Sequence, residues 1–121
     1  EVRRSNGFKG YAVNGTPADS VKIAVKSIMK EKPDIIVSGI NAGANVGQSL
    51  LYSGTISAAS EGTLLGIPSI AISLDALRDM DFSTSKVVAK KIVNKVLEYG
   101  LPNETLLNVN IPKDTEGGIK G

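Results

Sequence analysis

The sequence predicts an α/β fold with a mainly parallel sheet that helices cover on both faces. Helix and strand patterns alternate along the chain, and the predicted strands at residues 35–37 and 69–73 carry apolar residues at consecutive positions. An antiparallel strand with one face in water would alternate apolar and polar residues instead. The chain has 121 residues, of which 41% are hydrophobic, and this is enough for the core of one domain.

The first predicted elements are a short strand and a helix. Residues 10–13 are expected to form the end of a strand. Thr16 then has the position of a helix cap, because a proline follows it and Asp19 lies three residues further on, as in a capping box. We expect this helix to end near Lys30, since Pro33 restricts the conformation of the residue before it.

The rest of the chain continues the alternation of strand and helix. The segment between the strands at 35–37 and 69–73 predicts a helix over residues 55–65, which Gly66 and Pro68 bring to an end. A further helix is predicted for residues 84–99 and a last strand for residues 106–111, whereas the glycine-rich segment 116–121 fits no regular element. The sequence shows no internal repeat and no domain boundary, so we expect a single domain.

A loop rich in glycine and polar residues connects the strand at 35–37 to the helix at 55–65. Gly39, Gly43 and Gly47 are spaced four residues apart and let the backbone approach a ligand where a Cβ atom would block it. In open α/β sheets, ligands bind beyond the carboxyl ends of the strands, where such loops lie. Free N–H groups at the start of a helix favour an anion. The loop therefore predicts a phosphate site. Its polar candidates are Asn41, Asn45, Ser53 and Thr55.

Two common nucleotide motifs are absent from this loop, and a purely structural interpretation stays open. The loop has neither the close G-x-G-x-x-G spacing of a dinucleotide fold nor the Gly-Lys-Ser/Thr of a P-loop. A long connection whose Asn and Gly residues only satisfy turn geometry would explain any single Asn-Gly pair. The concentration of hydroxyl and amide groups at the predicted helix start favours the phosphate interpretation.

Composition excludes several classes of function. A formal net charge of +2, with lysines spread along the helices, gives no basic stripe for a nucleic-acid polymer. No apolar run has the length of a membrane span, so we expect a cytoplasmic protein. The chain has no His and no Cys, which excludes a histidine general base and soft-metal sites within these residues. A metal held here would be a hard cation on oxygen ligands, such as Mg²⁺ or Mn²⁺.

Seven segments resemble, in order, the sequence pattern of the SurE family of metal-dependent nucleotidases. They are Gly15-Thr-Pro-Ala-Asp19, Val37-Ser-Gly-Ile-Asn-Ala-Gly-Ala-Asn45, Tyr52-Ser-Gly-Thr55, Glu61-Gly62, Gly66-Ile-Pro68, Ala71-Ile-Ser73 and Leu107-Asn-Val-Asn-Ile-Pro112. The resemblance implies a Rossmann-like three-layer α/β/α domain. It also implies release of phosphate from nucleoside monophosphates with a divalent cation, and assembly as a homodimer or homotetramer.

The resemblance also suggests roles for individual residues. By position in the family motifs, Asn41 would be a metal ligand, and an amide oxygen suits a hard cation. Asn45 would lie near the phosphate, which Ser53, Gly54 and Thr55 would bind. Hydrolysis would then use water activated by the metal, with no residue of this chain acting as a nucleophile or base.

The chain also departs from the family pattern. Members of the family resemble one another in an N-terminal strand that ends in an Asp pair and holds the metal, in a further Ser ligand, and in a C-terminal β-rich arm for oligomer contacts. None of these features is present in residues 1–121. We therefore expect an incomplete SurE-like domain that supplies one metal ligand and the phosphate loop but is inactive by itself.

Other polar residues have simpler expected roles. Asp75 is expected to begin a turn, Glu61 to make a structural hydrogen bond, and Asp19 to cap its helix. Asn108 and Asn110 alternate on the last strand and are expected to hydrogen-bond from the sheet to a loop. Tyr52 is expected to pack over the phosphate loop rather than to stack on a base.

Three functions remain possible from the sequence. The first is a metal-dependent phosphomonoesterase, in which a cation polarises the phosphate and activates water. The second is a non-catalytic nucleotide or phosphate sensor on the same scaffold, since a fold does not determine function. The third is a purely structural α/β module.

Overall fold

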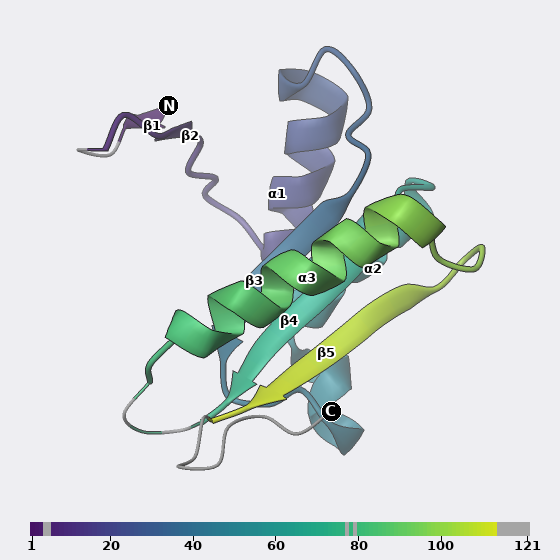
Figure 1. Ribbon diagram of the computed structural model, residues 1–121. Coiled ribbons are helices and arrows are strands. Elements are labelled where there is room, and N and C mark those ends of the chain that lie inside the picture. Colours follow the sequence, from purple (N-terminus) through teal and green to yellow (C-terminus); the bar gives the residue numbers. More distant parts are fainter. Residues whose placement is uncertain (4–5, 77, 79, 114–121) are drawn as a thin grey trace.

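The computed structural model describes residues 1–3, 6–76, 78 and 80–113, and within these residues it is a three-layer α/β/α arrangement (Figure 1). The central sheet contains β3 (Ile36–Ala42), β4 (Ser69–Asp75) and β5 (Leu106–Pro112) in that order, and both pairs of neighbours are parallel. The prediction of an α/β fold with a parallel sheet is confirmed. The glycine-rich segment 116–121 lies outside the described residues.

Two helices cover opposite faces of the sheet. Helix α3 (Ser83–Tyr99) lies in front of the sheet in Figure 1, where Val96 joins Ile70, Ile72 and Ile111 in the buried apolar core. Helix α2 (Gly54–Leu64) lies behind it and packs on the other side of β4. Neighbouring residues of a strand point to opposite faces. Ile70 therefore faces α3, and Ser69 faces α2.

The capping box predicted at Thr16 is present at the start of helix α1 (Pro17–Ile23). The Thr16 hydroxyl accepts from the Asp19 N–H at 3.1 Å, and the Asp19 carboxylate accepts from the Thr16 N–H at 2.8 Å. The end predicted near Lys30 is confirmed to within two residues. A π-helical segment, η1 (Ala24–Ile28), follows α1 and ends where the Met29 N–H donates to the Ala24 carbonyl oxygen and Met29 becomes extended.

The strand predicted at residues 10–13 is also wrong. The structure has two-residue strands β1 (Val2–Arg3) and β2 (Lys9–Gly10), which pair with each other in the antiparallel direction. Among the residues that the structure describes, no strand pairs with residues 11–13, so their apolar character does not produce a strand. In Figure 1 this short pair lies away from the main sheet.

Strand β3 is longer and less buried than the sequence predicts. Pairing with β4 continues past residue 37 through a register shift between Ser38 and Asn41, so the first part of the predicted loop belongs to the sheet. Within the described residues β3 has a neighbour on one side only, and Val37 is 44% exposed in a groove between α1 and β3. Both α2 and α3 contact β3, so helices meet both of its faces as its apolar run predicts, while one of its edges has no strand neighbour among the described residues.

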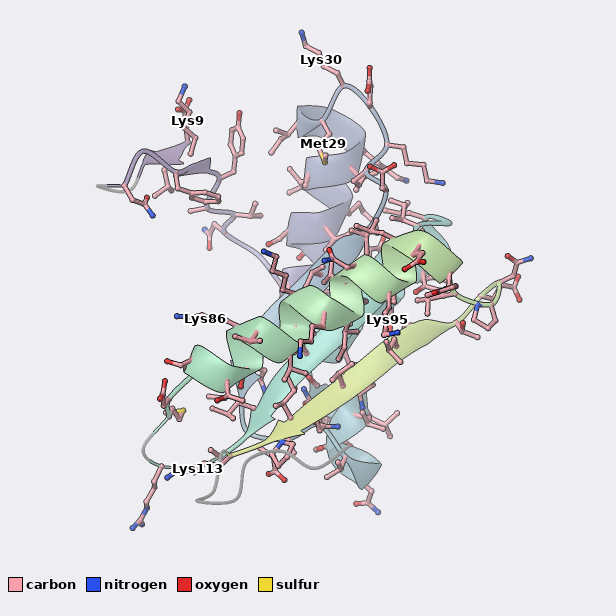
Figure 2. All side chains as sticks on the ribbon, in the orientation of Figure 1. Lys9, Met29, Lys30, Lys86, Lys95 and Lys113 are labelled. Atoms are coloured by element: carbon pink, nitrogen blue, oxygen red, sulfur yellow. The ribbon has the colours of Figure 1, made fainter. Side chains whose placement is uncertain are left out.

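The other predicted elements are confirmed with small shifts of their ends. Helix α2 begins and ends one residue before the predicted range, α3 begins one residue earlier, and β4 and β5 extend by two residues and one residue. The described helices include none that is long and apolar enough to cross a membrane. Figure 2 shows Lys86 and Lys95 along α3, and Lys9 and Lys30 on other parts of the fold.

Close contact between α2 and the sheet depends on Gly62. A Cβ atom at this position would collide with the Ser69 hydroxyl and lie 2.6 Å from Ile36 Cδ1. Ala58, Ala59 and Gly62 are the buried residues of α2, so small side chains make up its inner face. The helix therefore lies nearer to the sheet than larger residues would allow.

We predict that Gly62→Ala destabilises the protein, although alanine is the better helix former by about 1 kcal/mol. Overpacking costs about 1 to 3 kcal/mol, which exceeds this gain. The free energy of unfolding from urea titration measures the effect. As a control, Leu64→Ala on the same helix changes a side chain that is 82% exposed and should leave stability nearly unchanged. An increase in stability for Gly62→Ala would contradict the close packing.

Candidate functional site

The predicted phosphate loop lies at the edge of the sheet where the parallel strands end. It leaves β3, passes through the 3₁₀ helix η2 (Gly47–Tyr52) and enters α2, close to the arrowheads of β4 and β5 in Figure 1. The Gly43 N–H donates to the Leu74 carbonyl oxygen at 2.9 Å. This bond ties the start of the loop to the carboxyl end of β4, the position where open α/β sheets bind ligands.

The three loop glycines all have positive φ angles. These are 124° at Gly39, 98° at Gly43 and 54° at Gly47, conformations that glycine adopts at little cost. A Cβ atom at Gly39 would also collide with the carbonyl oxygen of Ile72 in β4. The glycines thus allow β3 to stay paired with β4 while the chain turns into the loop.

Asn41 lies at the end of β3, beside Ser73 of β4. Its side-chain NH₂ group donates to the Gly43 carbonyl oxygen at 2.8 Å, and the residue is partly exposed. This bond uses the nitrogen end of the amide, so the orientation of the side chain leaves the Oδ1 atom for another partner. An oriented amide oxygen at the end of a strand has the chemistry of a ligand for Mg²⁺ or Mn²⁺.

Asn45 is oriented toward the interior of the fold. It is 5% exposed, and its side-chain NH₂ group donates to the Ser73 hydroxyl at 2.8 Å. Its backbone N–H donates to Asn110 Oδ1 at 2.7 Å, and its carbonyl oxygen accepts from Asn108 and Asn110 at 3.0 Å and 3.1 Å. Asn45 thus anchors the loop to the sheet, and its contact with phosphate stays a prediction.

The start of α2 has the geometry of an anion site. Ser53 is the helix cap, and its hydroxyl accepts from the Ile56 N–H at 3.2 Å. The first turn of a helix has more N–H groups than one cap can satisfy, and these groups attract negative charge. Gly54 and Thr55 occupy this turn. A Cβ atom at Gly54 would lie 2.9 Å from Pro17 Cγ, so this glycine also lets the starts of α1 and α2 meet.

Tyr52 differs from its expected role. We expected its ring to pack over the loop, but the residue is 88% exposed. The 3₁₀ helix that carries Tyr52 has no buried residue. The expectation of packing is therefore wrong within the described part of the chain.

The acidic residues have mainly structural roles. The carboxylate of Asp19 accepts hydrogen bonds from the Thr16 backbone and hydroxyl, and these bonds hold the pKa of Asp19 below its ordinary value. Glu61 forms an ion pair with Lys22 at 3.4 Å, which links α2 to α1. Asp75 is the exposed last residue of β4. Across the described ranges, no group of three or more Asp, Glu, His or Cys side chains is placed to hold a metal ion.

The predicted bonds from the last strand to a loop are confirmed for Asn108 and Asn110, since both donate to Asn45. Sequence reasoning missed Ser73, whose hydroxyl accepts from the side chain of Asn45. The available signal was a serine at position 73 inside a mainly apolar strand, together with the alternating Asn residues of the last strand.

Comparison with known proteins identifies the family. The family model described as "Survival protein SurE" matches residues 1–121. The chain belongs to the SurE family. It is 52% identical over 120 residues to a protein named 5'-nucleotidase SurE from Caldanaerobacter subterraneus subsp. tengcongensis, and this match covers 99% of the chain and 47% of the relative. A protein of the same name from Chlorobium luteolum is 50% identical over 121 residues, which are 100% of the chain and 47% of that relative.

A solved structure shows the same fold. The SurE protein from Aquifex aeolicus superimposes with a TM-score of 0.79 at 49% identity, over 82% of this chain and 40% of that protein. This SurE-family chain therefore spans about half the length of the curated relatives that it matches.

Proposed function

We propose that the complete protein is a metal-dependent phosphomonoesterase that releases phosphate from nucleoside monophosphates. The observation that supports this most directly is the strand–loop–helix unit that begins at Asn41 and ends at Ser53 and Thr55. At one end it has an oriented amide oxygen, and at the other a helix start suited to an anion. The name 5'-nucleotidase of two relatives near 50% identity supports the substrate class.

The described residues fit a metal only in part. Asn41 Oδ1 is one suitable oxygen ligand, and no cluster of three acidic side chains accompanies it in the described ranges. A cation in a phosphatase usually has carboxylate ligands as well, which reduce its net charge. The remaining ligands would have to come from other parts of the complete protein. A bound Mg²⁺ or Mn²⁺ would supply Lewis-acid stabilisation of the phosphate charge and activation of water.

The contribution of this chain is then to bind and orient the phosphate. Thr55 and the N–H groups of the first turn of α2 would hold the phosphate oxygens and stabilise the charge that develops on them. Asn41 would fix the cation relative to the loop. Ser53 has no His near it that could act as a base, because the chain contains none. A serine without an adjacent base is a poor nucleophile, so we propose direct attack by water.

Two other functions remain as alternatives. A nucleotide or phosphate sensor would bind the same anion without turnover, and a structural module would bind neither metal nor phosphate. The complete protein would act in the cytoplasm as a homodimer or homotetramer, according to our proposal, on small phosphomonoesters rather than on nucleic-acid polymers or membranes.

We predict that the complete protein releases phosphate from nucleoside monophosphates with Mg²⁺ or Mn²⁺ and that EDTA abolishes this release. Residues 1–121 alone should be inactive, because one amide ligand neutralises too little of the charge of a cation to retain it. Colorimetric phosphate assays on both proteins measure this. Binding of phosphate and metal without turnover would support the sensor, and turnover by residues 1–121 alone would contradict the proposed division of ligands.

For Asn41→Ala in the complete protein, we predict a loss of activity at limiting metal of about 10-fold or more, by analogy with altered metal shells. Excess metal should recover part of the activity, because the variant weakens binding of the cation rather than removing the other ligands. Metal titrations of the rate give the apparent affinity. Asn94→Ala, at an exposed position of α3, is the control and should behave as the unmodified protein. Full activity of Asn41→Ala at limiting metal would exclude the ligand role.

Thr55→Val should cost the complete protein roughly 1 to 3 kcal/mol of binding to the charged phosphate, because it removes a donor and keeps the volume. Thr63→Val, at the other end of α2, serves as the matched control.

Ser53→Ala in the complete protein should likewise weaken phosphate binding, lose about 1 kcal/mol of helix capping and keep a residual rate. Inhibition by inorganic phosphate measures the loss of binding, and the midpoint of thermal unfolding measures the loss of helix capping. A phosphoserine at Ser53, trapped by rapid quench and found by mass spectrometry, would replace this mechanism with a two-step one.

A further inference from the structure

The most concentrated set of long-range hydrogen bonds in the described residues converges on Asn45, in the middle of the loop. Four bonds reach this residue from Ser73, Asn108 and Asn110, with lengths between 2.7 Å and 3.1 Å. All four cross from the loop to the sheet, over sequence separations of 28 to 65 residues. No other loop residue described here has so many bonds to the sheet.

Asn110 contributes two of these bonds through one side chain. Its Oδ1 atom accepts from the Asn45 N–H and its Nδ2 atom donates to the Asn45 carbonyl oxygen. The side-chain amide therefore satisfies both polar groups of the Asn45 backbone, as a neighbouring β-strand would. Two contact points fix the orientation of the loop residue as well as its position. Asn108 adds a single bond to the same carbonyl oxygen.

The anchor for these side chains is rigid. Asn108 and Asn110 lie two residues apart on β5 and so share the face of the sheet that the loop covers. β5 pairs with β4 without interruption from Leu106 to Pro112, and Asn110 lies opposite the fully buried Ser73. Ser73 holds the side chain of Asn45 while Asn110 holds its backbone.

Fold stability alone does not account for these amides. A buried polar group costs stability unless it is paired, whereas an apolar side chain on the same face would only need to pack. Asn108 Oδ1 is buried without a hydrogen-bond partner among the described residues, so one such cost remains. What the amides do achieve is a fixed position for Asn45.

We infer that Asn110 is a positioning residue for the proposed phosphate site, with Asn108 in a lesser role. It acts through Asn45 to hold the loop that connects Asn41 to Ser53 and Thr55, so that the metal ligand and the anion-binding helix start keep a constant separation. This inference rests on the proposed function. Catalysis is sensitive to such placement, since a displacement of about 1 Å can cost about 100-fold in rate.

The test uses the complete protein with three substitutions of graded expected effect. Asn110→Leu removes two bonds to Asn45, Asn108→Leu removes one, and Asn103→Leu changes an exposed residue at the opposite end of the sheet. We expect kcat/KM for a nucleoside monophosphate to fall about 10- to 100-fold for Asn110→Leu, by less for Asn108→Leu, and not at all for Asn103→Leu. The inhibition constant of inorganic phosphate should rise in the same order.

A structural role for Asn110 would give a different result. It would lower the midpoint of thermal unfolding and leave KM, kcat and phosphate inhibition of the folded protein unchanged, and this outcome would overturn the inference. Equal effects of Asn108→Leu and Asn110→Leu would overturn it as well.

If the unmodified protein shows no metal-dependent turnover, the proposed function fails, and hydrogen exchange still tests the anchor. The Asn45 N–H should lose protection in Asn110→Leu and keep it in Asn103→Leu, and protection retained in Asn110→Leu would contradict the positioning role.

Discussion

The fold depends on the complete burial of β4 between two different environments. Residues 69–74 of this strand are all buried, and the strand pairs with neighbours on both sides. Ile70 and Ile72 face α3 and form the apolar core, and full burial of such a side chain stabilises by roughly 1.5 to 3 kcal/mol. Ser69 and Ser73 point to the other face, where α2 and the loop approach. One strand thus separates the layer that stabilises the fold from the layer that carries the site.

The polar face explains why the site lies where it does. At the amino end of β4, the small side chain of Ser69 and the absence of a side chain on Gly62 allow α2 to lie close to the sheet. At the carboxyl end, the Ser73 hydroxyl and the Asn110 amide bind the loop instead of a helix. The loop therefore covers the end of the sheet while α2 starts beside it. A uniformly apolar face would stabilise packing but would offer the loop no directional contacts.

The sequence predicted those features that depend on local interactions. The capping box at Thr16 involves partners within three residues, so its pattern is readable without the fold. The extent of β3 was not predictable, because pairing with β4 overrides the turn preference of Gly39 through a register shift. The inward orientation of Asn45 depends on residues up to 65 positions away. The alternating Asn residues of β5 indicated a bond to some loop, but not to which one.

The distribution of charge in the chain bears on the cation that we propose. No Lys or Arg occurs in the sequence between Lys32 and Arg78, the stretch that contains the whole loop and α2. A phosphate monoester dianion that binds at Thr55 would meet hydroxyl and N–H dipoles but no basic side chain from this stretch. Helix dipoles contribute the equivalent of roughly half a positive charge, which cannot balance two negative charges. A divalent cation can balance them, and Asn41 places an oriented oxygen ligand at the beginning of the same loop. In the proposed function, the absence of basic residues from this stretch and the amide at the strand end would be two parts of one arrangement, in which the protein would supply geometry and the metal would supply charge.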